Sequence, residues 1–449
     1  MAEVQLNILI CGVTSDTSSL FIALYNYLKC SGHNVNFIIP EYSGAVCLIN
    51  KNVPFISLEQ VKPPCDSDSD LVDNVLLEKC INYDLKQTNF NSKFIRKIKY
   101  KRLLRNAKLI YQSYNSYLRE KKFDLIITWG GIRYYSSIPA SIAKRNGIKC
   151  VFIEKGLFPF TLQIDSNGVN AASNLRNEFG TLSNENEFYS LAVLQARLKE
   201  PWYFNQPLNE ISSLLKIKYL IKHFGWSELF IKIYHKYFET KLLGKFVYKD
   251  NWKVNDPFST SDVILNQDFV FIPFQVSDDS QLLVQGDWLD NNIDLVKSVY
   301  KGLKESGLET KIVVKEHPRE YINYDFKKKL TKYNIYFSGA GTLDLINKSK
   351  LVVTINSTAG FEALVFNKPV VITGNALYES IPLITKCNSQ KELTSSLKTL
   401  LMSDKKNDEN LVNKYVSAVF NKLIKCDYVN ASGKEVEDLW TAISGIIQN

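Results

Sequence analysis

Residues 350–365 read KLVVTINSTAGFEALV, and this stretch contains the pattern that decides the fold. The apolar run at 351–355 has the length of a buried strand, and a helical pattern begins at residue 361. The polar loop between them therefore lies after a strand and before a helix, where backbone N–H groups and hydroxyls form a ready anion site. A plain helix cap made by Ser357 or Thr358 is the alternative explanation.

The same alternation of strand and helix recurs along both halves of the chain. Strand-like runs occur at 5–11, 35–39, 124–128, 149–153, 269–273, 311–314, 351–355 and 369–373, most of them followed by helical patterns. This rhythm is typical of parallel sheets in α/β proteins. We therefore predict an α/β fold in which two Rossmann-like, doubly wound domains face a central cleft, with a helical excursion between them.

With 449 residues, the chain is too long for one ordinary domain. We assign residues 1–184 to an N-terminal Rossmann-like domain and 261–425 to a second one. Between them, residues 185–260 form a basic, aromatic helical segment, and residues 426–449 form a helical tail.

Composition excludes several classes of protein. No apolar run approaches the roughly 20 residues that cross a bilayer, and the start of the chain lacks a basic region and a long apolar core, so we expect a cytoplasmic protein. The eight cysteines are scattered without zinc-ligand spacing. The net charge of +9 fits nucleic acid, an anionic membrane surface or an anionic substrate alike, but no nucleic-acid-binding motif is present.

Cationic and acidic side chains follow the predicted strands. Lys315 and His317 come directly after the strand at 311–314 and suit a phosphate-bearing leaving group, although a His-Pro pair also occurs as an ordinary loop cap. Glu362 lies one turn into the next helix, where it either accepts hydrogen bonds from a ribose or favours the helix dipole. The sequence has no P-loop motif, which argues against a triphosphatase.

Carboxylates follow two further strands. Residues 275–280 read QVSDDS, so either Asp278 or Asp279 can serve as a nucleophile or base, although adjacent aspartates are also common in solvated turns. Glu154 follows the strand at 149–153 and is a candidate general base or simply the start of a loop.

Taken together, these motifs resemble the retaining β-Kdo transferases of bacterial capsule and lipopolysaccharide assembly and, more distantly, other CMP-sugar transferases of the GT-B type. The resemblance spans about half of the chain. It is carried by EKG at 154–156 with DSNGVNAAS at 165–173, QVSDDS at 275–280, KEHP at 315–318, and NSTAGFEAL at 356–364 followed by KPV at 368–370.

The resemblance implies CMP-β-Kdo as the donor, bound by the C-terminal domain, and a glycan or glycolipid acceptor that approaches from the N-terminal domain. It makes Asp279 the nucleophile, with Asp278 as the alternative register, and Glu154 the acid/base residue. Retention then follows from double displacement through a covalent sugar adduct. Lys315 and His317 would neutralise the departing phosphate, for which His317 counts as catalytic. The remaining substrate-binding residues are Ser357 and Thr358 for the phosphate, Glu362 for the ribose, Arg133 and Lys155 for the sugar carboxylate, and Gly360, Gln275, Ser280 and Asn170.

No metal or cofactor is expected, because the leaving group is already a phosphate monoester and the sequence has no DxD motif. Two basic, aromatic-rich stretches at 93–108 and 216–253 fit peripheral contact with the anionic inner face of the cytoplasmic membrane, or are solvated helix faces. Two other functions stay open. One is a transferase for another CMP-nonulosonate such as sialic acid, and the other is a non-catalytic glycan-binding or export subunit.

Overall fold

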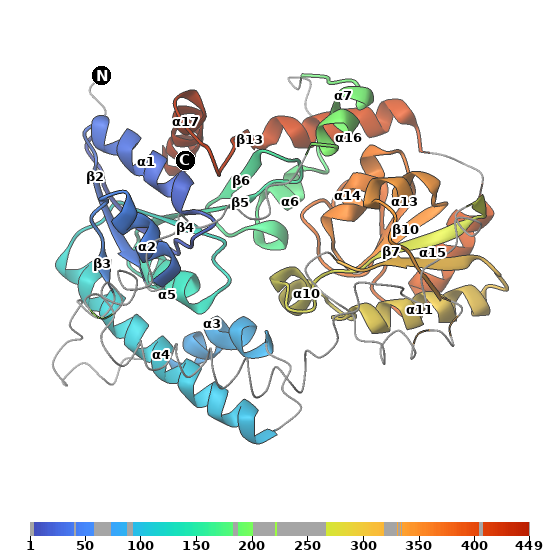
Figure 1. Cartoon of the computed structure of the whole chain (residues 1–449), viewed down its shortest axis with the longest axis horizontal. Coiled ribbons are helices and arrows are strands. Elements are labelled where there is room, and N and C mark those ends of the chain that lie inside the picture. The colour runs from blue at the N-terminus through green and yellow to red at the C-terminus, as the bar shows by residue number, and fades with distance from the viewer. Residues whose placement is uncertain are drawn as a thin grey trace.

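The computed structural model describes residues 4–39, 42–57, 73–87, 93–182, 187–200, 221, 266–317, 330, 333, 335–403 and 407–448. Two sheets form the centres of two halves that lie side by side (Figure 1). Helices cover both faces of each sheet, and each half has an apolar core on either side of its strands. This arrangement confirms the predicted α/β fold with two Rossmann-like domains.

The N-terminal sheet has seven strands in the order β13-β6-β5-β4-β1-β2-β3. The five strands from β5 to β3 pair in parallel, whereas β6 and β13 add an antiparallel edge. The strands are β1 (Asn7–Cys11), β2 (Asn34–Ile39), β3 (Ile56–Ser57), β4 (Leu125–Trp129), β5 (Lys149–Lys155), β6 (Thr161–Asp165) and β13 (Ile424–Lys425). The central strands are buried on both faces, which explains why they read as nearly continuous apolar runs.

The C-terminal sheet has six parallel strands in the order β12-β11-β10-β7-β8-β9. They are β7 (Phe269–Pro273), β8 (Lys311–Lys315), β9 (Ile335–Phe337), β10 (Leu351–Thr354), β11 (Val370–Ile372) and β12 (Ile384–Lys386). The strand order reverses between β7 and β10, and in such sheets ligands bind beyond the carboxyl ends of the strands at this switch point. The loops after β7 and β10 are therefore the expected binding loops.

Several helices begin at a capping side chain, so local sequence explains their starts. Asp73, Asn291 and Ser389 each accept a hydrogen bond from a backbone N–H of the following turn. In the N-terminal half the helices are α1 (Ser18–Cys30), α2 (Tyr42–Asn50), α3 (Asn74–Lys86), α4 (Lys93–Glu120), α5 (Tyr134–Arg145), the 3-10 turn η3 (Asn170–Ala172) and α6 (Leu175–Glu178). Helix α7 (Leu191–Leu198) follows in sequence but packs into the core of the C-terminal half, against α14 and α16. Further along are α10 (Ser280–Gln285), α11 (Asn292–Glu305), α13 (Thr342–Lys348), α14 (Thr358–Val365), α15 (Gln390–Met402), α16 (Glu409–Lys422) and α17 (Lys434–Gln448).

The two halves exchange segments. After α16, which packs on the C-terminal half, the chain returns to the N-terminal half, where β13 pairs with β6 and α17 packs against α1 (Figure 1). Trp440 of α17 is buried in the N-terminal core. In the other direction, Phe158 lies in the core of the C-terminal half, with its ring centroid 5.4 Å from that of Phe361. The tail predicted at 426–449 thus completes the N-terminal half.

Some predictions fall on residues outside the described ranges. These include most of the basic, aromatic segment at 185–260, of which the structure describes only 187–200 and 221. Helix α14 begins at Thr358, three residues before the predicted start, because Ser357 caps it. Within the described ranges no helix combines the length and the apolarity that a membrane span requires.

Candidate functional site

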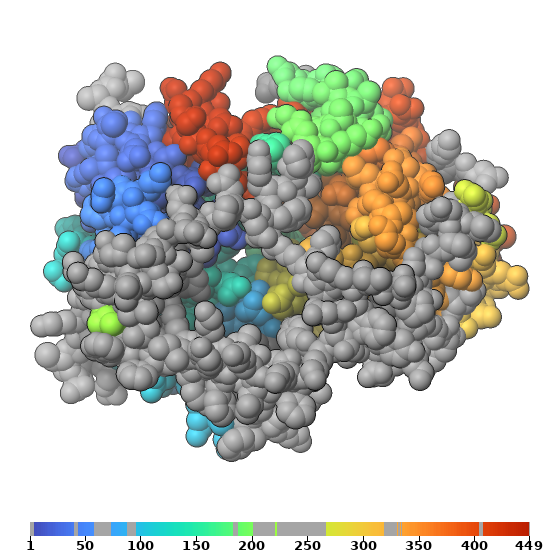
Figure 2. Space-filling model, in the orientation of Figure 1, coloured from blue at the N-terminus to red at the C-terminus, as the bar shows by residue number. Residues whose placement is uncertain are grey.

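Loops from both sheets meet between the two halves. β5 brings Glu154 there, and the loop after β7 brings Asp278 and Asp279, which precede α10. Figure 2 shows a hollow between the halves, in which yellow atoms of the segment after β7 lie beside blue-green atoms of the N-terminal half. The predicted carboxylates therefore come from opposite halves and face the same space.

Glu154 is half-buried near the end of β5. Its Oε1 accepts a hydrogen bond from the Lys155 N–H at 3.0 Å, and its Oε2 faces Gly130, where an added Cβ would lie 3.4 Å away. Burial raises the pKa of Glu154 to about 7, and the negative charge of Asp279 contributes to the rise, whereas the Lys155 amide and ammonium oppose it. A carboxyl group with this pKa is suited to proton transfer near neutral pH.

Asp279 is half-buried and caps α10. Its Oδ1 accepts a hydrogen bond from the Gln281 N–H at 2.9 Å, which fixes the carboxylate at the start of the helix. Asp278 is exposed, and its Oδ2 accepts a hydrogen bond of 3.4 Å from Gln87. The electrostatic effect of Asp279 on Glu154 supports Asp279 as the carboxylate that faces the acid/base candidate.

Helix α3 of the N-terminal half holds the backbone around α10. The Tyr83 hydroxyl donates to the Asp278 carbonyl at 3.0 Å, and Lys86 Nζ donates to the Leu283 carbonyl at 2.9 Å. Burial raises the pKa of Tyr83 to about 12, so its hydroxyl keeps its proton and remains a donor at neutral pH. The position of the predicted nucleophile thus depends on both halves.

Arg133 lies beside this contact, at the N-cap of α5. Its Nη1 is 3.8 Å from Asp84 Oδ1, and its guanidinium carbon lies 5.6 Å from the centroid of the Tyr83 ring. Its side chain remains 39% exposed. Asp84 and Tyr83 thus hold Arg133 in a partly exposed position, and its contact with a sugar carboxylate stays a prediction. Lys155 lies with its Nζ 5.0 Å from the centroid of the Tyr428 ring.

The loop after β10 forms the N-terminus of α14. Ser357 accepts a hydrogen bond from the Ala359 N–H at 3.3 Å, so it is a helix cap, and Thr358 next to it is exposed. Glu362 is half-buried one turn further, and burial raises its pKa to about 7. The sequence offered two explanations for this loop, a helix cap and an anion site. Both can hold, because Ser357 caps the helix while its exposed N-terminus still attracts negative charge.

Gly360 has a packing role in this loop. An added Cβ would overlap the hydroxyl of Tyr378, which is buried and donates to the Ser357 carbonyl. The glycine therefore allows the close approach that fixes the loop. Whether it also approaches a phosphate stays a prediction.

Lys315 is the last residue of β8, and His317 follows two residues later at the same edge of the C-terminal sheet. Lys315 Nζ donates to the Ala340 carbonyl, and burial lowers the pKa of Lys315. His317 is half-buried. Within the described part of the chain, no three His, Cys, Asp or Glu side chains gather in a way that would hold a metal ion.

Two predicted binding residues are engaged inside the protein. Gln275 is buried, and its Nε2 donates to Asn356 Oδ1 at 2.9 Å. Asn170 has a left-handed backbone with φ of 56°, and exchanges two hydrogen bonds with the Gln163 amide, at 2.7 and 2.8 Å. Ser280, in contrast, is half-buried as the first residue of α10.

A pocket of about 200 Å³ opens beside Glu154, between α5 and the turn before η3. Gly130, which faces the Glu154 carboxyl, belongs to its wall, as does Gln285 of the C-terminal half. The rest of its lining is Gly131, Ile132, Ser137, Ala140, Ser141, Lys144, Phe152, Asn167, Gly168, Val169 and Ala172. The pocket combines hydroxyl, amide and ammonium groups and contains no carboxylate side chain.

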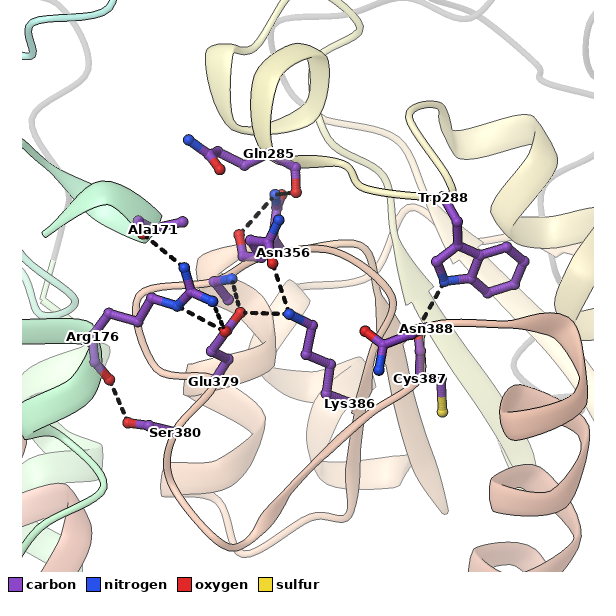
Figure 3. A network of polar contacts seen from close by, with 12 residues as sticks. Ala171, Arg176, Gln285, Trp288, Asn356, Glu379, Ser380, Lys386, Cys387 and Asn388 are labelled. Atoms are coloured by element: carbon purple, nitrogen blue, oxygen red, sulfur yellow. Dashed lines mark hydrogen bonds and ion pairs between the residues drawn. The ribbon is translucent and has the colours of Figure 1, made fainter.

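Sequence reasoning missed an ionic network that joins the two halves (Figure 3). Arg176 Nε donates to Glu379 Oε1 at 2.7 Å, and Lys386 lies 3.2 Å from the other carboxylate oxygen. Glu379 is only 9% exposed, and it also accepts from the Ala376 N–H at 3.0 Å. Arg176 lies 203 positions from Glu379, and none of these residues belongs to a motif, so no local signal identifies the pair that joins the halves.

Comparison of the sequence with known proteins identifies its family. A family model described as capsule polysaccharide biosynthesis protein matches residues 124–424. Protein FixF of Sinorhizobium fredii (strain NBRC 101917 / NGR234) is 26% identical over 293 residues, which cover 65% of this chain and 59% of FixF. The capsule polysaccharide export protein KpsS of Escherichia coli is 25% identical over 287 residues, which cover 58% of this chain and 69% of KpsS.

Among solved structures, Thermosulfurimonas dismutans KpsC, a beta Kdo 2,7 transferase, is 16% identical, with coverage of 74% of this chain and 89% of that chain and a TM-score of 0.36. The family match contains Glu154, Asp279, His317 and the loop that begins α14, and it extends over more than half of the sequence. The chain therefore belongs to the capsule polysaccharide biosynthesis protein family.

Proposed function

We propose that this chain is a retaining glycosyltransferase that moves β-Kdo from CMP-β-Kdo to a glycan or glycolipid acceptor during surface polysaccharide synthesis. One observation carries the proposal. Glu154 and Asp279 come from opposite halves, and the charge of Asp279 helps to raise the pKa of Glu154 to about 7. A carboxyl group with a raised pKa beside a second carboxylate is typical of acid/base and nucleophile pairs.

The proposed chemistry has two displacements. In the first, an Asp279 carboxylate oxygen attacks the anomeric carbon of the sugar, the bond from that carbon to the phosphate oxygen breaks, and CMP leaves with the electron pair. In the second, Glu154 takes the proton of the acceptor hydroxyl while that oxygen displaces Asp279. Each step inverts the anomeric carbon, so the product retains the configuration of the donor. The hydrogen bond from the Gln281 N–H holds Asp279 Oδ1 for the first step.

The proposed leaving-group site lies at the carboxyl edge of the C-terminal sheet. The N-terminus of α14, with Ser357 and Thr358, offers hydrogen bonds to the CMP phosphate, and Lys315 and His317 offer positive charge or a proton. Glu362 would bind the ribose. Arg133, held against Tyr83, is the proposed partner of the sugar carboxylate.

The pocket supports acceptor entry from the N-terminal half, since Gly130 in its wall also faces the carboxyl of the proposed base Glu154. The exposed basic face of α4 supports contact with an anionic membrane that carries a lipid-linked acceptor. We propose that this contact occurs at the cytoplasmic face. Neither a metal nor a cofactor takes part in the proposed steps.

The proposal is tested with three donors in parallel, namely CMP-Kdo generated in situ, CMP-sialic acid and no donor. CMP release and the intact mass of the protein are followed with and without glycolipid acceptors. CMP release and an added sugar mass with CMP-Kdo alone support the proposal. The same result with CMP-sialic acid alone would replace Kdo by another nonulosonate, and glycan binding without CMP release would make the chain a non-catalytic binding or export subunit.

A further inference from the structure

The loop after β10 contains a buried side chain that does not face the proposed phosphate site. Asn356 is only 6% exposed and immediately precedes Ser357. Its side-chain amide points toward the α10 segment, as Figure 3 shows for Asn356 and Gln285. The residue therefore lies between the proposed leaving-group loop and the helix that Asp279 caps.

The hydrogen bonds of Asn356 fix the orientation of its amide. Its Nδ2 donates to the backbone carbonyls of Gln281 at 2.8 Å, Gln285 at 3.2 Å and Asn375 at 3.2 Å. Its Oδ1 accepts from Gln275 Nε2 at 2.9 Å. Since all three neighbours of Nδ2 can only accept, the reversed orientation would place an oxygen against three carbonyl oxygens. Asn356 thus contacts the second and the last residue of α10.

The amide of Gln275 completes this anchor. Its Oε1 lies 3.4 Å from the Asn356 N–H, so the two residues form a reciprocal pair. The side-chain amide of Asn292 binds both backbone groups of Gln275. The Gln275 N–H donates to Asn292 Oδ1 at 3.1 Å, and Asn292 Nδ2 donates to the Gln275 carbonyl at 2.7 Å. The strand ends on either side of the switch point are therefore tied together beneath α10.

Helix α10 has six residues, which is too short to be stable by itself in water. Its position must come from contacts with the rest of the protein. On the N-terminal half these are the bonds from Tyr83 and Lys86. On the C-terminal half, Leu282 of α10 is buried in the apolar core, and the polar contacts are the Asn356 amide and the Asn375 N–H, which donates to the Gln285 carbonyl at 2.8 Å. Asn356 is the side chain that spans the length of the helix.

We propose that Asn356 is a positioning residue, which holds the backbone of α10 so that the Asp279 carboxylate lies in line with the reacting carbon. This inference rests on the proposed function of Asp279. It separates two roles within one loop, since Ser357 faces the phosphate while Asn356 fixes the nucleophile. Loss of the anchor shifts Asp279 while the N-terminus of α14 stays in place. A displacement of about 1 Å lowers the rate of a well-oriented reaction by about 10²-fold.

The test uses Asn356→Asp, which has nearly the same shape and keeps the acceptor for Gln275, but replaces the donor to the three carbonyls by an oxygen. Exposed Asn410 of α16 provides the matched control, Asn410→Asp, which makes the same change of charge in the same half. CMP binding is measured by calorimetry, and the rate of sugar adduct formation from CMP-Kdo is measured by rapid quench and intact mass. We expect adduct formation to slow by about 10²-fold while the Kd for CMP changes less than threefold, with no effect in Asn410→Asp.

Adduct formation at the wild-type rate in Asn356→Asp would overturn the inference and leave the proposed function intact. A parallel fall in CMP affinity and adduct rate would also overturn it, because Asn356 would then act through the phosphate loop. If Asn356→Asp does not fold, Asn356→Ala is measured in the same way. Hydrogen exchange gives a readout that needs no donor chemistry, in which the α10 amides lose protection and the α14 amides keep it. Equal protection of α10 in the wild type and variant would refute the anchor even if the wild type forms no adduct.

Discussion

Replacement of Glu154 by Gln is expected to stabilise the folded protein at pH 8. Burial raises the pKa of this carboxyl from its ordinary 4.5 to about 7, so the folded protein binds the proton more tightly than the unfolded chain. The ionised form therefore costs stability. The cost is absent below about pH 4, grows between about 4.5 and 7, and is complete above about pH 8.

The size of the effect follows from the same two pKa values. A rise from 4.5 to about 7 corresponds to at most about 3.5 kcal/mol, at about 1.4 kcal/mol for each pH unit. Because the glutamine side chain has no charge to bury, Glu154→Gln should gain close to this amount at pH 8 and about 1 kcal/mol at pH 5. Glu362 has a similarly raised pKa, but it is present in both proteins and its contribution cancels in the difference.

The assay is urea unfolding of the wild type, Glu154→Gln and the control Glu309→Gln at pH 5 and pH 8. Glu309 is exposed in a loop, so its replacement should change the free energy of unfolding little at either pH. A stability gain in Glu154→Gln that is the same at both pH values would refute the reasoning, since a change in packing alone does not depend on pH. A loss of stability at pH 8 would refute it as well.

Three further results are expected. Gly360→Ala should lower the free energy of unfolding by about 1–3 kcal/mol, as measured in urea, because the added methyl group overlaps the Tyr378 hydroxyl; an unchanged value would show that the loop yields easily. Replacing Lys97, Lys101 and Arg105 on the exposed face of α4 by Glu should abolish salt-sensitive sedimentation with phosphatidylglycerol vesicles, because each removed positive charge costs about 1 kcal/mol of binding free energy. Undiminished binding would place the membrane contact elsewhere. Transfer activity should survive dialysis against EDTA, and its loss with recovery on adding a divalent ion would disprove metal independence.

The strands at the centre of both sheets could be predicted, because each is an apolar run of strand length that ends in a polar loop. Strands β3, β6, β9, β12 and β13 were not predicted, since they lie toward the sheet edges and are mostly too short to give such a run. The same pattern placed Glu154, Asp279 and Ser357 at the carboxyl ends of strands, where α/β proteins bind their ligands. Both signals are local, since burial on two faces and a helix cap leave their mark within a few residues.

Contacts between distant segments could not be predicted in this way. The Arg176 and Glu379 pair joins residues 203 positions apart, and Asn356 reaches α10 from 71 and 75 positions away. A buried asparagine after an apolar strand gives the same sequence signal whether it binds a ligand or a neighbouring backbone. The return of α17 to the N-terminal half is likewise a matter of tertiary packing, because an amphipathic helix does not specify its partner.

The central claim is that Asp279 forms a covalent bond to the transferred sugar. The most direct measurement incubates the protein with CMP-Kdo without acceptor, digests it at low pH, and locates the modified residue by tandem mass spectrometry. The wild type and Asp278→Asn should each gain one Kdo residue on Asp279, and Asp279→Asn should gain none. A modified Asp278, or unmodified protein that nevertheless transfers Kdo to an acceptor, would contradict the account.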